Sequence, residues 1–252
     1  MRQKFIPLRC PRLKAWQNWL SCILFQTHNM KQTVDWHRHW ARPNPGFHEG
    51  QVNRYLLKYL PLFTLAEGAT IFVPLCGKAV DILWLSQQGF KIIGVELSKV
   101  AVESFFEESK LDFTTQRDGE FTRYDADNIT LYQGDFLHLQ AQHLRNCTLV
   151  YDRASIVAIE SFNRASYQHK MLQIIPSATP MLMVTLDYDQ AQMSGPPFSV
   201  PVSEIRQLYQ NEYVIEVLES NQQIEERSRW RDKGLTSLIE SALKLTPKEE
   251  LK

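Results

Sequence analysis

From residue 35 onward, short continuous apolar runs alternate with segments of helical spacing, and this alternation constrains the fold more than any other feature of the chain. The runs at 70–74 and 91–96 are rich in β-branched residues and poor in polar ones, which is typical of strands buried on both faces. Six strands are expected at 70–74, 91–96, 129–132, 148–151, 181–186 and 213–218, and four helices at 49–60, 80–88, 100–108 and 203–210.

This order of elements predicts an α/β fold, with a doubly wound, mostly parallel sheet and helices on both of its faces. The chain has 252 residues, which suits one domain of this kind. No internal repeat or low-complexity linker interrupts the pattern. We therefore expect a single domain at residues 31–252.

The first 34 residues differ in composition from the rest of the chain. They carry six basic residues and no Asp or Glu, whereas the remainder carries 22 basic and 28 acidic residues. Such a break marks a tail or processed segment, so residues 1–30 are expected to be a basic leading extension. Polar residues interrupt its apolar stretch and no A-x-A-like site follows, which argues against a secretory signal. A peripheral membrane anchor, an organellar presequence and an upstream extension before a start at Met30 remain open.

Charge and cysteine content bear on the class of protein. The 28 basic and 28 acidic residues leave no net positive charge for a general nucleic-acid binder. No run of 18 apolar residues is present, so no membrane-spanning helix is expected. The cysteines form no C-x-x-C pair and no metal-ligand spacing, which favours a reducing, cytoplasmic compartment and no metal site; they are Cys10, Cys22, Cys76 and Cys147.

The loop after the first predicted strand indicates what the sheet binds, because ligands of such sheets lie beyond the carboxyl ends of the strands. It reads Pro74-Leu75-Cys76-Gly77-Lys78, which is neither the G-x-G-x-x-G fingerprint nor a Walker motif. Glu96 closes the second strand, where a carboxylate can accept hydrogen bonds from two ribose hydroxyls. The alternative for Glu96 is a solvated side chain at a strand end.

The third strand is followed by Gly134-Asp135-Phe136, a turn that can present Asp135 to an adenine edge and Phe136 to its face. A ribose carboxylate without a pyrophosphate loop suggests an adenosine-bearing cofactor that lacks phosphates. S-adenosyl-L-methionine is the common cofactor of this kind.

Two motifs, 71–79 (IFVPLCGKA) and 94–98 (GVELS), resemble those of the thiopurine S-methyltransferase family. Further landmarks follow in the family's order and extend the resemblance over about residues 35–245: Trp36 and Trp40, Gly46-Phe47-His48, Tyr151-Asp152-Arg153, Gly195-Pro196-Pro197-Phe198 and Glu225-Glu226-Arg227.

The resemblance implies a class I S-adenosylmethionine-dependent methyltransferase fold, with a seven-stranded, mostly parallel, Rossmann-like sheet. Its final antiparallel hairpin would pair strand 213–218 with a short strand near 222–226, with Asn221 near the turn. The cofactor residues implied by the resemblance are Trp36, Trp40, Leu75, Glu96, Asp135, Phe136 and Arg153. Phe47 and Arg227 are implied as substrate residues, and Arg153 as the catalytic residue.

The implied reaction moves a methyl group from S-adenosyl-L-methionine to the sulfur of a thiopurine or a related aromatic thiol. Selenium and tellurium compounds are further implied acceptors, and the family implies a monomer. Two other classes stay open: a sensor that binds the cofactor without catalysis, and a methyltransferase for oxygen or nitrogen acceptors. For single residues the alternatives are structural. Trp36 and Trp40 could be core packing, and Arg153 a salt bridge at a strand end.

Overall fold

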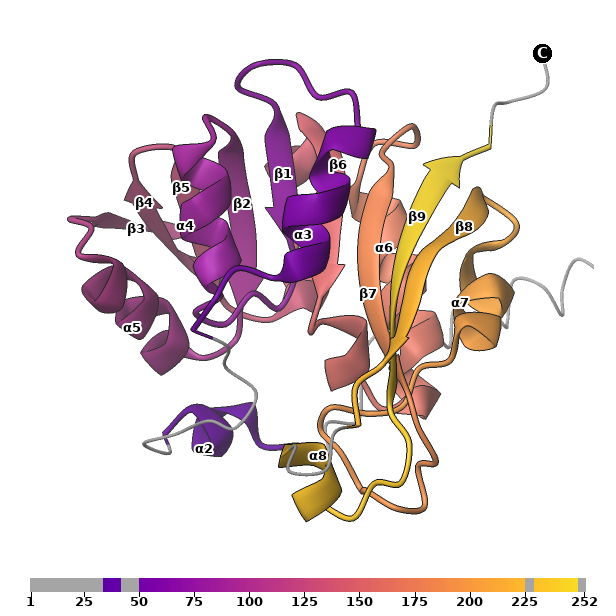
Figure 1. Ribbon diagram of the computed structural model, residues 1–252. Helices are drawn as coiled ribbons and strands as arrows, with labels where there is room; N and C mark the ends of the chain where they lie inside the picture. The colour runs from indigo at the N-terminus through magenta and orange to yellow at the C-terminus, as the bar shows by residue number, and fades with distance from the viewer. Residues whose placement is uncertain (1–33, 42–49, 225–228, 249–252) are drawn as a thin grey trace, which may run out of the picture. The chain divides into compact units, whose positions relative to one another are not determined.

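Nine strands form one mixed sheet in the order β3-β4-β5-β2-β1-β6-β7-β9-β8 (Figure 1). The computed structural model describes residues 34–41, 50–224 and 229–248. Strands β5, β2, β1, β6 and β7 pair in parallel, whereas β3, β4, β8 and β9 make antiparallel pairs at the two ends of the sheet. The strands are β1 Thr70–Val73, β2 Lys91–Glu96, β3 Thr114–Asp118, β4 Phe121–Ala126, β5 Ile129–Gln133, β6 Cys147–Arg153, β7 Met181–Asp187, β8 Tyr213–Gln222 and β9 Ile239–Pro247.

Helices connect the parallel strands and lie on both faces of the sheet, as an α/β fold requires. Figure 1 shows α3, α4 and α5 in front of the strands and α6 behind them. None of the helices in the described ranges combines the length and apolar character needed to cross a membrane. The α-helices are α2 Trp36–Trp40, α3 Arg54–Tyr59, α4 Val80–Gln87, α5 Lys99–Ser109, α6 Arg164–Ile174, α7 Val202–Tyr209 and α8 Arg229–Asp232, and the 3-10 helices are η1 Leu60–Leu62, η2 Phe136–His138, η3 Ala141–Leu144, η4 Ile156–Ala158 and η5 Ser161–Asn163.

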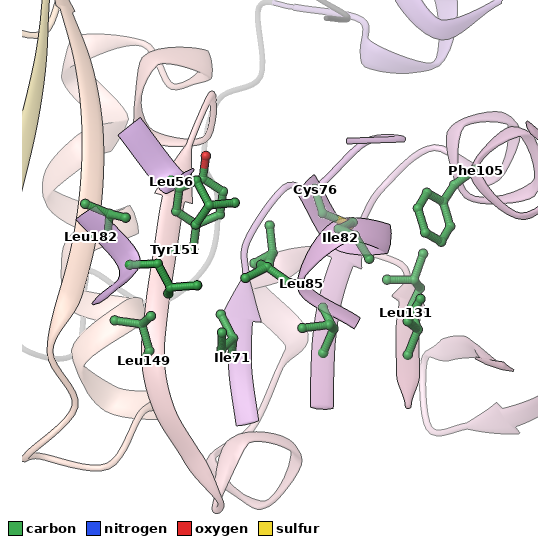
Figure 2. Packing of buried hydrophobic residues seen from close by; sticks show 14 of the residues in the cluster. Leu56, Ile71, Cys76, Ile82, Leu85, Phe105, Leu131, Leu149, Tyr151 and Leu182 are labelled. Carbon is green, nitrogen blue, oxygen red and sulfur yellow. The ribbon is translucent and has the colours of Figure 1, made fainter. Parts of the chain in front are cut away.

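The main core lies between the sheet and helices α3, α4 and α5. Leu56 of α3, Ile71 of β1 and Leu85 of α4 are fully buried there (Figure 2). All four residues of β1 are buried, which explains why its sequence shows no alternation of polar and apolar residues. Truncating one such side chain to alanine typically costs about 2–5 kcal/mol, so this packing holds the strands in place.

Strand β6 is anchored on both faces of the sheet by successive residues. The Tyr151 hydroxyl donates to Oδ2 of Asp81 on α4 at 3.1 Å. The next residue, Asp152, accepts at its Oδ2 from the Tyr167 hydroxyl of α6 at 2.7 Å. Each bond is buried and involves a carboxylate, which makes it stronger than a neutral hydrogen bond.

The prediction of a mostly parallel α/β sheet is confirmed, with two strands more than the seven expected. The additional strands, β3 and β4, form an antiparallel hairpin beside β5. Asp118 pairs with Phe121, which leaves a two-residue loop with Gly119 at φ +57°. Glycine at the first position of a two-residue loop is typical of a type II′ hairpin turn, so the hairpin could have been predicted.

The predicted final hairpin is wrong in its second strand. Strand β8 continues through Asn221 to Gln222 and pairs with β9 rather than with residues 222–226. Because β9 lies between β7 and β8, it needs residues that pack inside a sheet. It supplies the buried Ala242, Leu243 and Leu245, whereas 222–226 (QQIEE) contains a single apolar residue.

Helix α3 is shorter than the predicted 49–60. It begins after Asn53, whose side chain accepts from the Tyr55 N–H at 2.9 Å. It ends at Tyr59, where Pro61 enters the 3-10 turn η1. A capping side chain and a proline are the usual limits of a helix, and here they decide its length.

Candidate active site

The loops that follow β1, β2, β5 and β6 lie together at one edge of the sheet. These strands run parallel, and the pairing of Val73 with Gly94 and of Glu96 with Gln133 brings their carboxyl ends to the same edge. The predicted residues Leu75, Glu96, Asp135 and Arg153 come from these four strand ends. This is the edge at which doubly wound sheets bind ligands.

Glu96 is a buried carboxyl at the end of β2. Its Oε2 accepts from the Gly77 N–H at 2.9 Å and its Oε1 from the Ser98 N–H at 2.8 Å. Burial raises the pKa of Glu96 to about 7, although these backbone donors act to lower it. A carboxylate has about four acceptor positions, so one further hydrogen bond to each oxygen is within its capacity.

The loop after β1 turns through two left-handed residues, Leu75 at φ +44° and Gly77 at φ +52°. A Cβ atom at Gly77 would lie 2.5 Å from Cζ2 of Trp40. Trp40, which is 8% exposed, therefore packs directly against this loop. Trp36 is half-buried on the same helix, and its ring centroid lies 5.7 Å from that of His39.

The turn after β5 is joined to β2, since Gly134 N–H donates to the Glu96 carbonyl at 2.9 Å. Asp135 begins η2, and its Oδ1 accepts from the Leu137 N–H at 2.9 Å. Phe136 is only 2% exposed, and its ring centroid lies 5.0 Å from that of Tyr167. The contact of Phe136 with an adenine face stays a prediction; in the structure its ring packs against Tyr167 of α6.

Arg153 is the last residue of β6, and the chain turns immediately after it. Ala154 has φ +62°, and the Ser155 hydroxyl donates to the Pro74 carbonyl at 2.6 Å. That bond connects the turn after β6 to the loop after β1. Asp152 accepts from the Ile156 N–H at 3.0 Å, and its burial raises its pKa to about 6.

Two predicted substrate residues, Phe47 and Arg227, lie outside the described residues, as does His48. The loop at 195–198 is described and lies next to η4: the Phe198 N–H donates to the Val157 carbonyl at 2.7 Å. The Tyr188 hydroxyl donates to the Pro197 carbonyl at 2.7 Å. Sequence reasoning missed Ser155 and Tyr188, because their roles depend on contacts between loops that are distant in sequence.

Cys76 lies in the β1 loop but is not suited to nucleophilic chemistry. It is 5% exposed, and burial raises the pKa of its thiol well above the usual value. A buried thiol that stays protonated is a poor nucleophile. The sequence interpretation of Cys76 as a small buried residue agrees with this position.

The polar groups at the carboxyl ends of β1, β2, β5 and β6 fit an adenosine without phosphates. Glu96 offers two acceptor oxygens for vicinal hydroxyls, and the left-handed β1 loop brings its backbone close to that carboxylate. The loop after β1 lacks the glycines that let a pyrophosphate approach the backbone, whereas a ribose can donate hydrogen bonds to the Glu96 carboxylate. S-adenosyl-L-methionine meets these requirements.

The model of the family described as Thiopurine S-methyltransferase (TPMT) matches residues 31–248. The chain belongs to the thiopurine S-methyltransferase family. A thiopurine S-methyltransferase from Pseudomonas aeruginosa (strain UCBPP-PA14) is 42% identical over 206 residues, which cover 82% of this chain and 94% of the relative. One from Nitrosospira multiformis (strain ATCC 25196 / NCIMB 11849 / C 71) is 41% identical over 206 residues, with the same coverage.

Solved structures show the same fold at low sequence identity. A SAM-dependent methyltransferase from Anabaena variabilis has a TM-score of 0.59 and 15% identity, covering 84% of this chain and 93% of its own. Phosphoethanolamine N-methyltransferase 2 from Haemonchus contortus, in complex with S-adenosylhomocysteine and phosphomonomethylethanolamine, has a TM-score of 0.60 and 10% identity, covering 85% and 61%. Membership of the thiopurine S-methyltransferase family makes this chain an S-adenosylmethionine-dependent methyltransferase, with S-adenosyl-L-methionine as its cofactor.

Proposed function

We propose that this methyltransferase acts on the sulfur of thiopurines or related aromatic and heterocyclic thiols, giving S-adenosylhomocysteine and a methyl thioether. Selenium and tellurium compounds are included as soft nucleophiles of the same kind. The observation that carries the proposal is the placement of Glu96 and Arg153 at the carboxyl ends of β2 and β6, at one edge of the sheet. Hydrogen bonds from Gly77 to Glu96 and from Ser155 to Pro74 connect both strand ends to the β1 loop. The family of the chain supports the same assignment.

Three groups of the chain hold the cofactor in this proposal. Glu96 accepts from the ribose, the loop at Leu75 lies beside it, and Trp40 covers the loop and excludes water. When bound, S-adenosyl-L-methionine supplies an electrophilic methyl group on a sulfonium. The aromatic face of a tryptophan attracts such a cation by ~0.5–2 kcal/mol.

Arg153 holds the acceptor. Its guanidinium donates charge-assisted hydrogen bonds to an anionic acceptor or to ring nitrogens, and we place it on the heterocycle rather than on the sulfur. Stabilising the sulfur anion before the reaction would raise the barrier. An aromatic thiol is ionised or polarisable near neutral pH, so alignment is the main contribution, worth about 7–11 kcal/mol when reactants are well oriented.

The test is methyl transfer from S-adenosyl-L-methionine to 6-mercaptopurine, thiophenol, selenite and tellurite. We expect turnover of the aromatic thiols, and Arg153→Ala to lower kcat/KM by about 10- to 100-fold, the effect of losing a hydrogen bond to a charged group. Cofactor affinity should fall by a smaller factor than kcat/KM, because Arg153 is also an expected cofactor residue whereas the ribose contact at Glu96 remains.

Arg117→Ala is the matched control, since Arg117 is exposed on β3, at the end of the sheet. Unchanged kinetics in Arg153→Ala would reject the role of Arg153. Cofactor binding without methylation of any acceptor in the set would favour a sensor, and methylation of oxygen or nitrogen acceptors alone would favour the other enzyme class.

We also assign the protein to the cytoplasm, as a single-chain enzyme that detoxifies soft nucleophiles. Cys76 and Cys147 are both free and buried, which suits a reducing compartment. Cell fractionation tests the compartment, and recovery in an oxidising compartment would contradict it.

A further inference from the structure

Asp152 directly precedes Arg153 in β6 and faces two buried tyrosines, Tyr167 and Tyr209. Its Oδ2 accepts from the Tyr167 hydroxyl at 2.7 Å, and its Oδ1 accepts from the Ile156 N–H at 3.0 Å. Tyr167 is on α6 and Tyr209 on α7, and both are fully buried. The Tyr209 hydroxyl makes no hydrogen bond to any residue that the structure describes.

We propose that Tyr167 is a positioning residue for Arg153. Its hydroxyl holds the Asp152 carboxylate, which holds the turn at residues 152–156 and with it the arginine between them. The expected effect on kcat/KM rests on the proposed function. The conformation of the turn does not, because hydrogen exchange measures it without any methyl transfer.

The turn needs such an anchor because its backbone is unfavourable on its own. Ala154 occupies the left-handed region at φ +62°, which costs a residue with a side chain about 1–2 kcal/mol. The bond from Ile156 N–H to Asp152 closes the turn around Ala154. This bond is strongest while the carboxylate stays in place and ionised, and the hydrogen bond from the Tyr167 hydroxyl favours both conditions.

The aromatic ring and the hydroxyl of Tyr167 have separate contacts. The ring packs on Phe136, which follows β5, whereas the hydroxyl donates to Asp152 of β6. Replacing tyrosine with phenylalanine therefore removes the hydroxyl and retains the ring. Tyr209 offers the matched control, because Tyr209→Phe deletes the same atom at an equally buried site where it makes no hydrogen bond within the described part of the chain.

The groups that face Asp152 allow a pH readout as well. They are Tyr167 from α6, Tyr209 from α7 and Ser155 from the turn itself. Since the Tyr167 hydrogen bond lowers the pKa of Asp152, its removal raises that pKa, and the acid limb of the rate profile should move to higher pH. The profile is measured at saturating cofactor, so that a change in cofactor affinity caused by the titration of Glu96 does not affect the rate.

The experiment compares Tyr167→Phe with Tyr209→Phe and the wild-type protein. We expect Tyr167→Phe to lower kcat/KM for 6-mercaptopurine by about tenfold at saturating cofactor, the loss expected for one hydrogen bond to a charged group. The Kd of S-adenosylhomocysteine by calorimetry should stay within twofold, and hydrogen exchange of the amides at 153–156 should accelerate. Tyr209→Phe should change none of these.

Unchanged exchange at 153–156 in Tyr167→Phe overturns the proposal whatever the activity. A parallel loss of cofactor affinity, or equal effects in both variants, also overturns it, because either result indicates general damage to the fold. If the wild-type protein methylates no acceptor but the exchange changes as expected, the proposed function fails while the anchoring of the turn stands.

Discussion

At the scale of single residues, two buried carboxyls at the active edge have different partners. Glu96 accepts from backbone N–H groups, among them those of Gly77 and Ser98, whereas Asp152 also accepts from the Tyr167 hydroxyl. Burial raises both pKa values, to about 7 for Glu96 and about 6 for Asp152. Glu96 can accept hydrogen bonds from ligand hydroxyls, whereas Asp152 fixes the turn at residues 152–156 through its bond from the Ile156 N–H.

Cofactor affinity should depend on pH through Glu96. Below about pH 7 the carboxyl is protonated and loses acceptor capacity, so the affinity for S-adenosyl-L-methionine should fall as the pH falls from 8 to 6. Glu96→Gln should weaken binding by about 10- to 100-fold at pH 8 and remove most of this pH dependence. Calorimetry at the two pH values measures both effects.

Glu107→Gln provides the control, since it makes the same change on an exposed position of α5. If Glu96→Gln binds the cofactor as tightly as the wild-type protein at pH 8, the ribose assignment is wrong.

Much of the site could be predicted from sequence because it depends on strand ends. Glu96 and Arg153 each close a recognisable strand, and parallel strands bring such residues to one edge. Tyr167 could not be predicted in this way, since its contact with Asp152 spans 15 residues and depends on how α6 packs on the sheet. The packing of Phe136 against Tyr167 could not be predicted for the same reason.

At the scale of elements, the loop after β1 and helix α2 depend on each other through Gly77 and Trp40. Gly77→Ala would place a Cβ 2.5 Å from the indole and strain a left-handed backbone at φ +52°. We expect Trp40 to be displaced and the affinity for S-adenosyl-L-methionine to fall by at least about tenfold, or ~1.4 kcal/mol. Calorimetry measures the affinity, and tryptophan fluorescence reports the displacement.

Gly119→Ala is the control that separates backbone strain at a positive φ from the steric clash with Trp40. Gly119 has a similar φ of +57°, but no atom lies within 4 Å of a Cβ built there. Its variant should lose roughly 1 kcal/mol of stability from the backbone alone and keep its cofactor affinity. Equal losses of affinity in the two variants would contradict a specific role for the contact with Trp40.

The prediction of elements succeeded for the buried parallel strands and for β8, and it missed β3, β4 and β9. Strand β1 is recognisable because burial on both faces demands an unbroken apolar run. Strand β3 is exposed and polar (TTQRD), so apolar patterning gives no signal for it. The partner of β8 is separated from it by residues 223–238, and no local turn identifies β9.

At the scale of the whole molecule, both terminal strands of the sheet resist pairing with a second copy. Strand β3 has five polar residues, and β8 has an irregularity between Val217 and Glu219. Short polar edges and bulges are features that prevent edge-to-edge association. We therefore expect a monomer, and light scattering should give a mass near 29.4 kDa. A mass near twice that value would contradict the expectation.

The hydrogen bonds of Tyr151 and Asp152 make the active site more sensitive to insertions and deletions in β6 than to substitutions there. Side chains of a strand alternate between faces, so one residue inserted before Tyr151 would carry that tyrosine and Asp152 to the wrong sides, away from Asp81 and Tyr167. A conservative replacement loses one contact, whereas an insertion or deletion loses both and also relocates Arg153. Natural variation in this segment should therefore consist of exchanges of residues and not of indels.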